Sequence, residues 1–373
     1  MIRYSEQHID EDDIFEVKEA LMSDCLTQGA RLELFEESIT KICKAKAAVA
    51  VTSASCALYL TYLAVGINEQ TLVWTTANTF TSTASMAKIL GAEIDFVDIE
   101  IDSYNICPEA LRNKLTTSDQ SPDFLVVVHF AGRSAKMKEL ALICQRYDIT
   151  IIEDASHALG AQYGSSMIGA CKYSIATIFS FHPVKTITTG EGGCITTKDR
   201  ALGKKLKLLR NHNIQNNSKV PWYKTQEKIG INGRMTELQA ALGISQLRKL
   251  KVFHEKRLRL VKIYADILNE DQYVLPQFDT PDNISSWHLF IIRIRERSEI
   301  KRNLLIQNLQ EQGIGANLHY YPLYRLNLYT KNKSAFPNNE LYFKTALTIP
   351  LNIKISFQDH DLISQKINAL FRT

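Results

Sequence analysis

Short apolar runs alternate with amphipathic segments over the first half of the chain. The runs are rich in aliphatic, β-branched and aromatic residues, as buried strands are, and they lie at 47–52, 72–74, 94–97, 124–128 and 149–154. Between them, apolar residues recur at helical spacing at 53–63, after 75–84 up to Gly91, at 108–115 and at 136–147. Strands that alternate with helices predict an α/β fold with a mainly parallel sheet and helices on both of its faces.

The rest of the chain carries further patterns around one long polar segment. Helices are predicted at 9–20, 199–210, 235–247, 249–268, 300–310 and 359–371, strands at 287–294 and 316–319, and a surface loop at 213–226. The helix at 249–268 is basic, but its continuous apolar stripe indicates packing between domains, with the charges in water. We therefore predict two domains: a large one at 1–248 with an N-terminal segment, and 249–373, which begins with the interdomain helix and continues as a smaller α/β unit.

The most distinctive stretch is TIFSFHPVKTITTGEGGCITT, residues 177–197. An apolar strand leads through Pro183 to Lys185, and a glycine-rich reversal then enters a second β-prone run. Such a turn would hold an amine in a partly buried place, and burial lowers the pKa of a lysine because it disfavours the ammonium form. Lys185 is therefore a candidate Schiff-base nucleophile. An exposed loop lysine is the alternative.

The apolar run at 149–154 ends in a carboxylate, and a histidine follows it. Parallel strands deliver such groups to the C-terminal edge of the sheet, where open α/β folds bind ligands. Pyridoxal phosphate needs an amine that condenses with its aldehyde and an acid that keeps its ring nitrogen protonated; Lys185 and Asp154 supply both, while alternation points Glu153 to the opposite face. His157 is a candidate partner of the cofactor's ring oxygen or of Asp154, with a structural core histidine as the alternative.

Small and hydroxylic residues also stand where the first predicted strand turns into a helix. The sequence there is Ser53-Ala54-Ser55. Backbone N–H groups and the positive end of a helix dipole make such a turn an anion site, which suits the phosphate of a cofactor. An ordinary N-cap serine is the alternative interpretation.

Two segments, EDASHALG and FSFHPVKTITTGEGG, resemble the sugar-nucleotide aminotransferases of the DegT/DnrJ/EryC1/StrS family, which have the type I fold of pyridoxal phosphate enzymes. The likeness extends from RYSEQHID and CLTQG, through INGRMTELQAALGISQL, to LHYYPLY. It implies pyridoxal 5'-phosphate as cofactor, with pyridoxamine 5'-phosphate as its aminated form, and a nucleotide sugar and an amino-acid donor, L-glutamate in the family, as substrates. Within the family the chain is similar to transaminases that aminate C4 of a UDP-linked 4-keto-6-deoxy-N-acetylhexosamine in the pseudaminic acid pathway; another UDP-, dTDP- or GDP-linked 4-keto-6-deoxyhexose is the alternative substrate.

The same resemblance implies roles for individual residues. Those expected to bind the cofactor are Ser53, Ala54, Ser55, Phe80, Asp154, His157, Ser180, Lys185 and Asn232. Those expected to bind the substrate are Tyr4, Asp24, Cys25, Leu26, Thr27, His319, Tyr320 and Tyr321. In the family the ring of the residue at Phe80 stacks on the cofactor, and the asparagine at Asn232 reaches across a homodimer to the partner's phosphate. The family has an aromatic residue between Asn232 and Arg234, whereas this chain has Gly233.

Composition restricts the partners and the compartment. The chain has 373 residues and 44 Lys and Arg against 40 Asp and Glu, and the net charge of +4 is too small to favour nucleic acid or a membrane. The seven cysteines are odd in number and include no C-x-x-C pair, so we expect buried free thiols, no metal site and a reducing cytoplasm. The polar N-terminus and the lack of an 18-residue apolar window predict neither a secretory signal nor a membrane span.

Two other functions are alternatives to transamination. A sugar dehydratase branch on the same scaffold replaces the Schiff-base lysine with histidine; Lys185 argues against it, and His182 fits the FxFHxxK pattern of the aminotransferases. A dinucleotide-binding or regulatory protein would need a phosphate loop, but no G-x-G-x-x-G follows a strand and no G-x-x-x-x-G-K-[ST] occurs.

Overall fold

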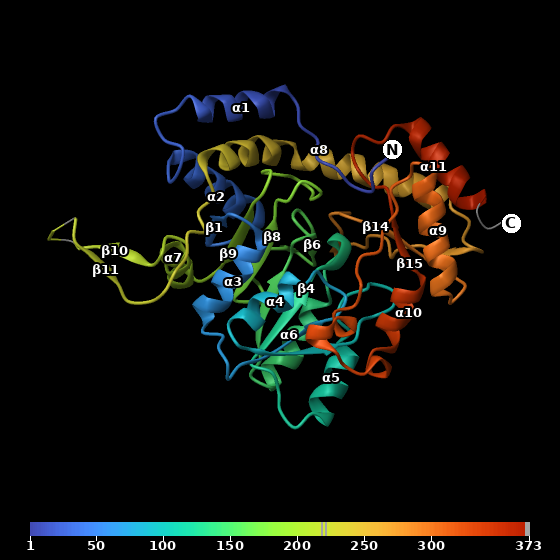
Figure 1. Ribbon diagram of the computed structural model, residues 1–373, viewed down its shortest axis with the longest axis horizontal. Helices are drawn as coiled ribbons and strands as arrows, with labels where there is room; N and C mark the ends of the chain where they lie inside the picture. The colour runs from blue at the N-terminus through green and yellow to red at the C-terminus, as the bar shows by residue number, and fades with distance from the viewer. Residues whose placement is uncertain (218, 221, 370–373) are drawn as a thin grey trace.

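The computed structural model describes residues 1–217, 219–220 and 222–369 (Figure 1). Its helices are α1 (Glu11–Leu21), α2 (Ala30–Cys43), α3 (Ala54–Val65), α4 (Ser82–Ile89), α5 (Pro108–Thr117), α6 (Met137–Arg146), α7 (Arg200–Leu209), α8 (Glu237–Ile267), α9 (Glu299–Glu311), α10 (Pro337–Thr345) and α11 (Phe357–Ala369). The strands are β1 (Ala47–Val51), β2 (Leu72–Thr76), β3 (Glu93–Val97), β4 (Phe124–Val128), β5 (Thr150–Asp154), β6 (Gln162–Tyr163), β7 (Ser166–Met167), β8 (Ala176–Ser180), β9 (Gly193–Thr197), β10 (Ile214–Asn216), β11 (Lys224–Gln226), β12 (Tyr273–Val274), β13 (Asn283–Ile284), β14 (Phe290–Ile294) and β15 (Ala346–Ile349).

A seven-stranded sheet in the order β1-β9-β8-β5-β4-β2-β3 forms the centre of the molecule. Only β9 runs against the others, because the glycine-rich reversal after Lys185 returns the chain beside β8. The mainly parallel sheet predicted from the alternation of strands and helices is therefore confirmed. Its strands begin and end within a few residues of the predicted runs, since most of these runs are apolar on both faces; β3, with Glu93 and Asp95 on one face, is the exception.

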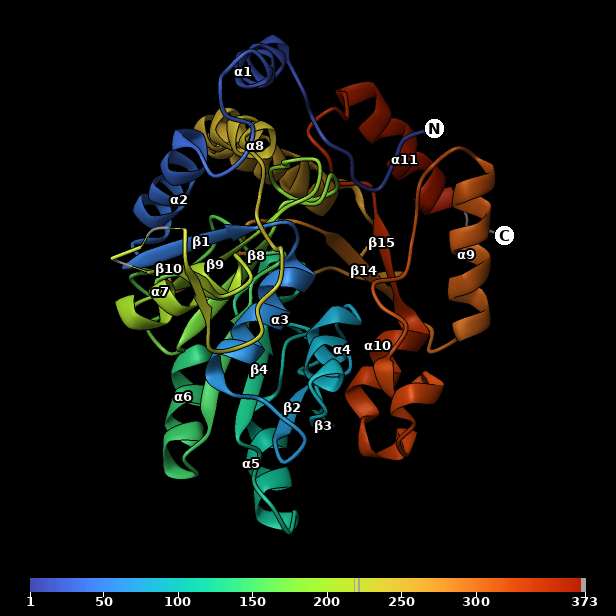
Figure 2. The same ribbon diagram turned by 60° about the vertical axis from the view of Figure 1, so that its left-hand side comes forward.

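Helices cover both faces of this sheet, as predicted (Figure 2). Alternate residues of neighbouring strands, such as Val126 and Ile152, pack under α3, α4 and α7. The residues between them face the other way: Leu125 and Ile151 pack against α5 and α6, and Phe179 packs against α2 and α8. In Figures 1 and 2, α1 lies along the outer side of α8.

The C-terminal part has a separate core around a three-stranded sheet, β12-β14-β15. It packs the second half of α8, through Val261 and Tyr264, against α9 and α11. The chain's first residues also join this part, because the Ile2 N–H donates to Gly313 O (2.8 Å) and the Leu351 N–H donates to Tyr4 O (2.9 Å). The division at 248 falls inside α8, and the two-domain organisation stays a prediction.

Several predicted elements differ from the structure. The two helices predicted at 235–247 and 249–268 are one helix, α8, because no Gly or Pro interrupts the helix-forming residues between them. The polar segment 213–226, predicted as a loop, contains the hairpin β10–β11, which projects from the body in Figure 1. Residues 316–319 form no strand: Asn317 makes a single bridge to Thr348. The end of the last predicted helix, at Phe371, lies outside the described residues.

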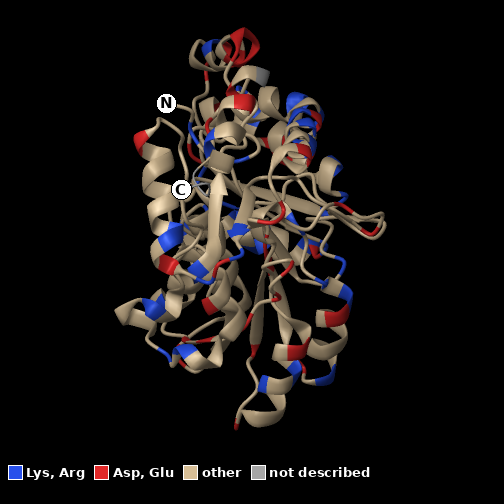
Figure 3. Cartoon of the chain, turned by 90° about the vertical axis from the view of Figure 1, so that its right-hand side faces the viewer, with Lys and Arg blue, Asp and Glu red and all other residues tan. Residues whose placement is uncertain are grey.

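Charge and sulfur chemistry add little to the architecture. Basic and acidic residues are interspersed on the face in Figure 3. All seven cysteines are free; Cys43, Cys144, Cys171 and Cys194 are buried, but Cys25 is exposed, against expectation. Within the described part of the chain, no helix has the length and apolar character that crossing a membrane requires.

Candidate active site

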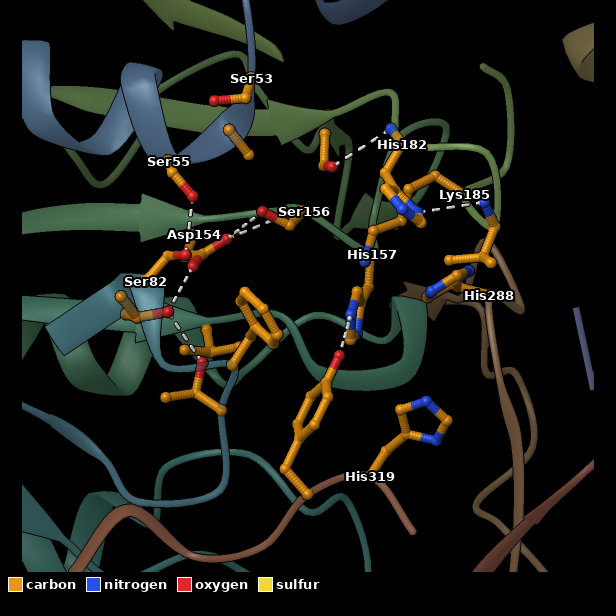
Figure 4. A pocket seen from close by; sticks show the side chains of 18 of the residues that line it. Ser53, Ser55, Ser82, Asp154, Ser156, His157, His182, Lys185, His288 and His319 are labelled. Carbon is orange, nitrogen blue, oxygen red and sulfur yellow. Dashed lines mark hydrogen bonds between the residues drawn. The ribbon is translucent and has the colours of Figure 1, made fainter. Parts of the chain in front are cut away.

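A pocket of about 630 Å³ lies at the C-terminal edge of the parallel strands (Figure 4). Its walls come from the ends of β4 and β5, the first turns of α3 and α4, the Lys185 turn, and the C-terminal part of the chain. The predicted site residues that line it are Tyr4, Ser53, Ala54, Ser55, Phe80, Asp154, His157, Ser180, Lys185, His319 and Tyr320. Segments up to about 300 residues apart in the sequence thus meet at one cavity.

Lys185 stands on the turn that follows β8. Its backbone N–H donates to His182 O (2.9 Å), and the Ser5 hydroxyl donates to the carbonyl of Val184 (2.7 Å), so the turn is fixed on both sides. Burial lowers the pKa of the lysine to about 8, although the carboxylate of Asp154 acts in the opposite direction. No hydrogen-bond or ion-pair partner for Lys185 Nζ lies in the described part of the chain, so the amine is free to react.

Asp154 ends β5 and is buried at the pocket wall. Its Oδ2 accepts a hydrogen bond from the Thr83 hydroxyl (2.7 Å), and its Oδ1 accepts from the hydroxyl (2.6 Å) and the N–H (3.1 Å) of Ser156. Three donors on two oxygens hold the carboxylate in one orientation. In Figure 4 it lies on the side of the pocket where the labelled serines gather.

Glu153 points away from the pocket, as alternation predicts. Its carboxylate is buried and accepts from the Ser174 hydroxyl, and it pairs with Nε2 of His129 at 2.7 Å. The Ala135 N–H donates to Nδ1 of His129 (3.2 Å), so the neutral ring carries its hydrogen on Nε2 and donates to Glu153. The two neighbouring acids of β5 therefore have separate partners on opposite faces.

The first turn of α3 forms one end of the pocket. Ser53 is the N-cap of α3, and its hydroxyl accepts from the Cys56 N–H (3.1 Å). Ser55 and Ser82, at the starts of α3 and α4, share a hydrogen bond of 2.7 Å between their hydroxyls. Gly193 backs this turn so closely that a Cβ there would meet the Ser53 carbonyl carbon at 2.4 Å. The N-cap role of Ser53 is therefore confirmed, and the anion site at this turn stays a prediction.

His157 contacts Tyr320 and makes no hydrogen bond to Asp154. The Ala131 N–H donates to Nδ1 of His157 (3.2 Å), and Nε2 lies 3.1 Å from the Tyr320 hydroxyl oxygen. Burial lowers the pKa of His157 well below its usual value, so the ring is neutral and carries its hydrogen on Nε2. It therefore donates to Tyr320, and the hydroxyl hydrogen of Tyr320 remains free to donate into the pocket.

Aromatic rings line another part of the pocket. Phe80 is 57% exposed at the pocket, and its ring centroid lies 6.0 Å from that of Tyr320. His319 is buried, with Nδ1 2.7 Å from the Thr348 hydroxyl, and burial lowers its pKa to about 3. The ring of Tyr4 lies 5.0 Å from that of His319. An exposed Phe80 leaves one ring face open for a flat ligand.

Some predicted residues do not line this pocket. Asp24, Cys25, Leu26 and Thr27 are exposed in the loop between α1 and α2. Tyr321 turns its ring to Phe343, 5.5 Å away, and Asn232 is exposed beside Asn211. None of these residues contacts the pocket of its own chain.

Other residues at the pocket are not among the predicted site residues. His288 is buried beside His157, with ring centroids 4.4 Å apart, and lies next to Lys185 in Figure 4. It lies in the strand predicted at 287–294, and nothing in that sequence marks it as a pocket residue. Thr83 and Ser156, which hold Asp154, could have been noticed because hydroxylic residues cluster at 79–85 and directly after the strand end.

Comparisons with known proteins agree with this geometry. The model of the DegT/DnrJ/EryC1/StrS aminotransferase family matches residues 7–368. A Campylobacter jejuni protein named UDP-4-amino-4,6-dideoxy-N-acetyl-beta-L-altrosamine transaminase is 35% identical over 99% of this chain and 97% of its own. Helicobacter pylori PseC, an aminotransferase involved in the biosynthesis of pseudoaminic acid, superposes with a TM-score of 0.91 at 30% identity, over 100% of this chain and 99% of its own. The putative sugar aminotransferase Spr1654 of Streptococcus pneumoniae, solved in PMP- and PLP-forms, reaches 0.93 and 0.92 at 26% identity, over 100% of this chain and 99% and 98% of its own.

Proposed function

Because the chain belongs to the DegT/DnrJ/EryC1/StrS aminotransferase family, we propose that it aminates C4 of a UDP-linked 4-keto-6-deoxy-N-acetylhexosamine, with L-glutamate as the donor. Its product would be UDP-4-amino-4,6-dideoxy-N-acetyl-beta-L-altrosamine, the sugar in the name of the Campylobacter relative. The chain is an aminotransferase, of a family that depends on pyridoxal phosphate. The observation that carries the reaction is the free amine of Lys185 in one pocket with the carboxylate of Asp154.

The residues present fit pyridoxal phosphate. Ser53, Ser55 and the N-terminus of α3 would hold the phosphate, with Ser180 at the same pocket. Asp154 would face the ring nitrogen, and Phe80 offers an open ring face. When bound, the cofactor supplies an aldehyde for an amine and a ring that withdraws electrons from the reacting carbon.

Lys185 would act as both the general acid and the general base of the proposed reaction. With its pKa near 8 the amine is neutral in about a tenth of the molecules at pH 7, far more than for an ordinary lysine, so it can take up a proton and return one at C4 of the sugar. Tyr320 would donate its hydroxyl hydrogen to an oxygen of the ligand, while the His157 Nε2–H donates to the hydroxyl oxygen of Tyr320. Asp154 would keep the ring nitrogen protonated because an anion next to a cation raises the pKa of the cation.

A homodimer with shared sites is the proposed assembly. Among the described residues that line the pocket, Lys185 is the only lysine or arginine, although a sugar nucleotide carries two phosphates. Asn232 is exposed and free to reach a partner, and its amide can donate to a phosphate oxygen. Because the seven cysteines are free, we place this dimer in the reducing cytoplasm.

Mixed dimers test the sharing. Lys185→Ala and Asn232→Asp chains are each expected to be inactive, the second because it sets an anion against the phosphate. Mixed, they should regain up to one working site in two, since one site takes its lysine and its asparagine from intact chains. No recovery, with subunit exchange shown by two affinity tags, would mean that Asn232 does not serve the partner.

A substrate panel tests the proposed reaction. UDP-, dTDP- and GDP-linked 4-keto-6-deoxyhexoses, with and without the N-acetyl group, are incubated with glutamate, and the aminated sugar and 2-oxoglutarate are measured. We expect the UDP-linked N-acetyl sugar to give the highest kcat/KM and a product with the altrosamine stereochemistry by NMR. A higher kcat/KM for another nucleotide or sugar would refute the substrate assignment and leave the reaction type intact.

A further inference from the structure

His288 is a buried pocket residue that has no role in the proposed reaction so far. Its backbone is fixed on both sides: its N–H donates to Ala131 O (3.0 Å), and Nη1 of Arg257 donates to its carbonyl oxygen (3.3 Å). Its ring lies at the pocket beside that of His157, and Nδ1 is buried without a hydrogen-bond partner. Because a buried polar atom without a partner costs free energy, we looked for the group that His288 serves.

The ring of His288 is neutral at neutral pH. Burial lowers its pKa well below the usual value. The groups that face it lower the pKa further, because protonation would set like charges side by side; they are His157, Lys185, Arg257 and His319. A neutral imidazole has one ring nitrogen with a free lone pair, so His288 can accept a hydrogen bond.

Lys185 is the pocket residue that lacks an acceptor. Its amine has no partner in the described part of the chain, and the oxygens of Asp154 already accept from Thr83 and Ser156. While the cofactor carries the amino group, the lysine is not bonded to it, and the proposed reaction then requires the lysine to hold a proton as an ammonium. An ammonium has three N–H donors, and in a buried place they need acceptors.

Three histidines lie near this amine, and they differ in what their rings already bind. Besides burial, the charge of Lys185 lowers the pKa of each of them: His157, His288 and His319. His157 uses both ring nitrogens in the contacts described above, and His319 uses Nδ1 for a hydroxyl. His288 uses neither nitrogen within the described part of the chain, and in Figure 4 it lies next to Lys185. Of the three rings, it alone has both nitrogens available.

We propose that His288 accepts a hydrogen bond from the ammonium of Lys185 whenever this lysine is not bonded to the cofactor, and that it is thereby a positioning residue of the reaction. The inference rests on the proposed function, in which Lys185 moves the proton at C4 of the sugar. The hydrogen bond would hold the amine in one direction at the pocket, while Arg257 fixes His288 through its carbonyl oxygen. It would also favour the charged form of the lysine and so oppose the effect of burial on its pKa.

Substitutions of similar size separate an acceptor from a residue that only fills space. His288→Leu removes both ring nitrogens, whereas His288→Asn and His288→Gln place an amide oxygen near the positions of Nδ1 and Nε2. The pKa of Lys185 is measured in protein loaded with pyridoxamine 5'-phosphate, where its amine is free, by competitive acetylation across pH and mass spectrometry, with exposed Lys88 as the internal reference. We expect this pKa to be lower by about one unit or more in His288→Leu than in the native protein, and to return in at least one amide variant.

Steady-state kinetics give a second readout. Loss of the acceptor should lower kcat about 10-fold and leave KM for the sugar nucleotide nearly unchanged, because the hydrogen bond acts on the lysine and not on the bound sugar. An unchanged pKa of Lys185 in His288→Leu would overturn the inference. An equal fall of this pKa in all three variants would overturn it as well, since His288 would then only fill space.

A measurement on native protein decides the inference if His288→Leu does not fold. In protein labelled with 15N-histidine, the ring resonances of His288, assigned by their absence in His288→Asn, should move with pH at the midpoint of the Lys185 titration and should not do so in Lys185→Ala. Resonances that do not follow the lysine would overturn the inference. Protein that shows these effects but transfers no amino group to any sugar nucleotide would refute the proposed function and leave the contact between His288 and Lys185 intact.

Discussion

The two neighbouring acids of β5 allow a matched test of stability against chemistry. Glu153→Gln changes the buried network on one face of the sheet, and Asp154→Asn changes the pocket on the other. In Glu153→Gln, the amide oxygen can still accept from the His129 Nε2–H and the Ser174 hydroxyl can turn to accept from the new NH₂, but the negative charge that strengthens both hydrogen bonds is lost. The ring cannot move its hydrogen to Nδ1, because that atom accepts the Ala135 N–H.

The two substitutions are expected to change different properties: Glu153→Gln the stability, and Asp154→Asn the turnover. Hydrogen bonds to a charged group contribute about 1.5–3 kcal/mol, so Glu153→Gln should lower the free energy of unfolding by about 2 kcal/mol, with kcat of the folded enzyme nearly unchanged. For a chain of 373 residues this corresponds to a fall of on the order of 3 °C in the midpoint of thermal unfolding. Asp154→Asn should lower that midpoint less, since Asp154 lines the pocket and has no histidine partner, and Thr83 and Ser156 can turn their hydroxyls to the amide. Its turnover should fall about 10- to 1,000-fold, because an opposite charge close to a titrating group changes its pKa by about one to three units.

Thermal unfolding followed by far-ultraviolet circular dichroism, together with steady-state turnover, measures both effects. The wild-type protein, which carries Glu153 and Asp154 and is prepared in the same way, gives the reference midpoint and turnover. If Glu153→Gln lost turnover at an unchanged midpoint, or if Asp154→Asn lost stability and kept turnover, the assignment of the two acids to opposite faces would be refuted.

Three further predictions follow from the pocket. Gly193→Ala would drive a Cβ into the Ser53 backbone at 2.4 Å. Because overpacking costs about 1–3 kcal/mol, the variant should bind pyridoxal phosphate about 5- to 150-fold more weakly. Gly164→Ala is the control, since nothing lies within 4 Å of a Cβ there, and it should not change that affinity; equal affinities of the two variants in an absorbance titration would contradict the anion site. The rate at which apoenzyme takes up pyridoxal phosphate should rise with pH, reach half of its maximum near pH 8 and level off about one unit above that, because the pKa of Lys185 is lowered from 10.5 to about 8. A rate that keeps rising beyond pH 10 would mean an unperturbed lysine. Tyr320→Phe removes the hydroxyl that His157 holds, so kcat/KM should fall about 10-fold, the loss of roughly one hydrogen bond; unchanged kinetics would exclude Tyr320 as a donor.

The residues that the sequence located best are those at strand ends. Lys185, Asp154 and Ser53 follow directly on apolar runs, so the parallel sheet alone brings them to one edge. The sheet itself followed from the same runs. These inferences needed only local pattern and the rule that parallel strands share an edge.

The misses have a common physical cause, which is contact between distant segments. His288 enters the pocket from the C-terminal part, and nothing in its neighbourhood distinguishes it from a core residue. The loop at 24–29 is placed by Glu237, more than 200 residues away, and no local pattern indicates that pairing. For Glu153 the sequence indicates only its direction, to the face opposite Asp154, because its buried partners His129 and Ser174 depend on the fold.

Borohydride reduction of the holoenzyme tests the central claim most directly. The protein is loaded with pyridoxal phosphate, reduced, digested and analysed by mass spectrometry, with Lys185→Ala treated in parallel. We predict that the yellow colour disappears on reduction and that the phosphopyridoxyl group is found on the peptide that carries Lys185, and on no peptide of the variant. A label on another lysine, or a native protein that takes up no cofactor, would contradict the account.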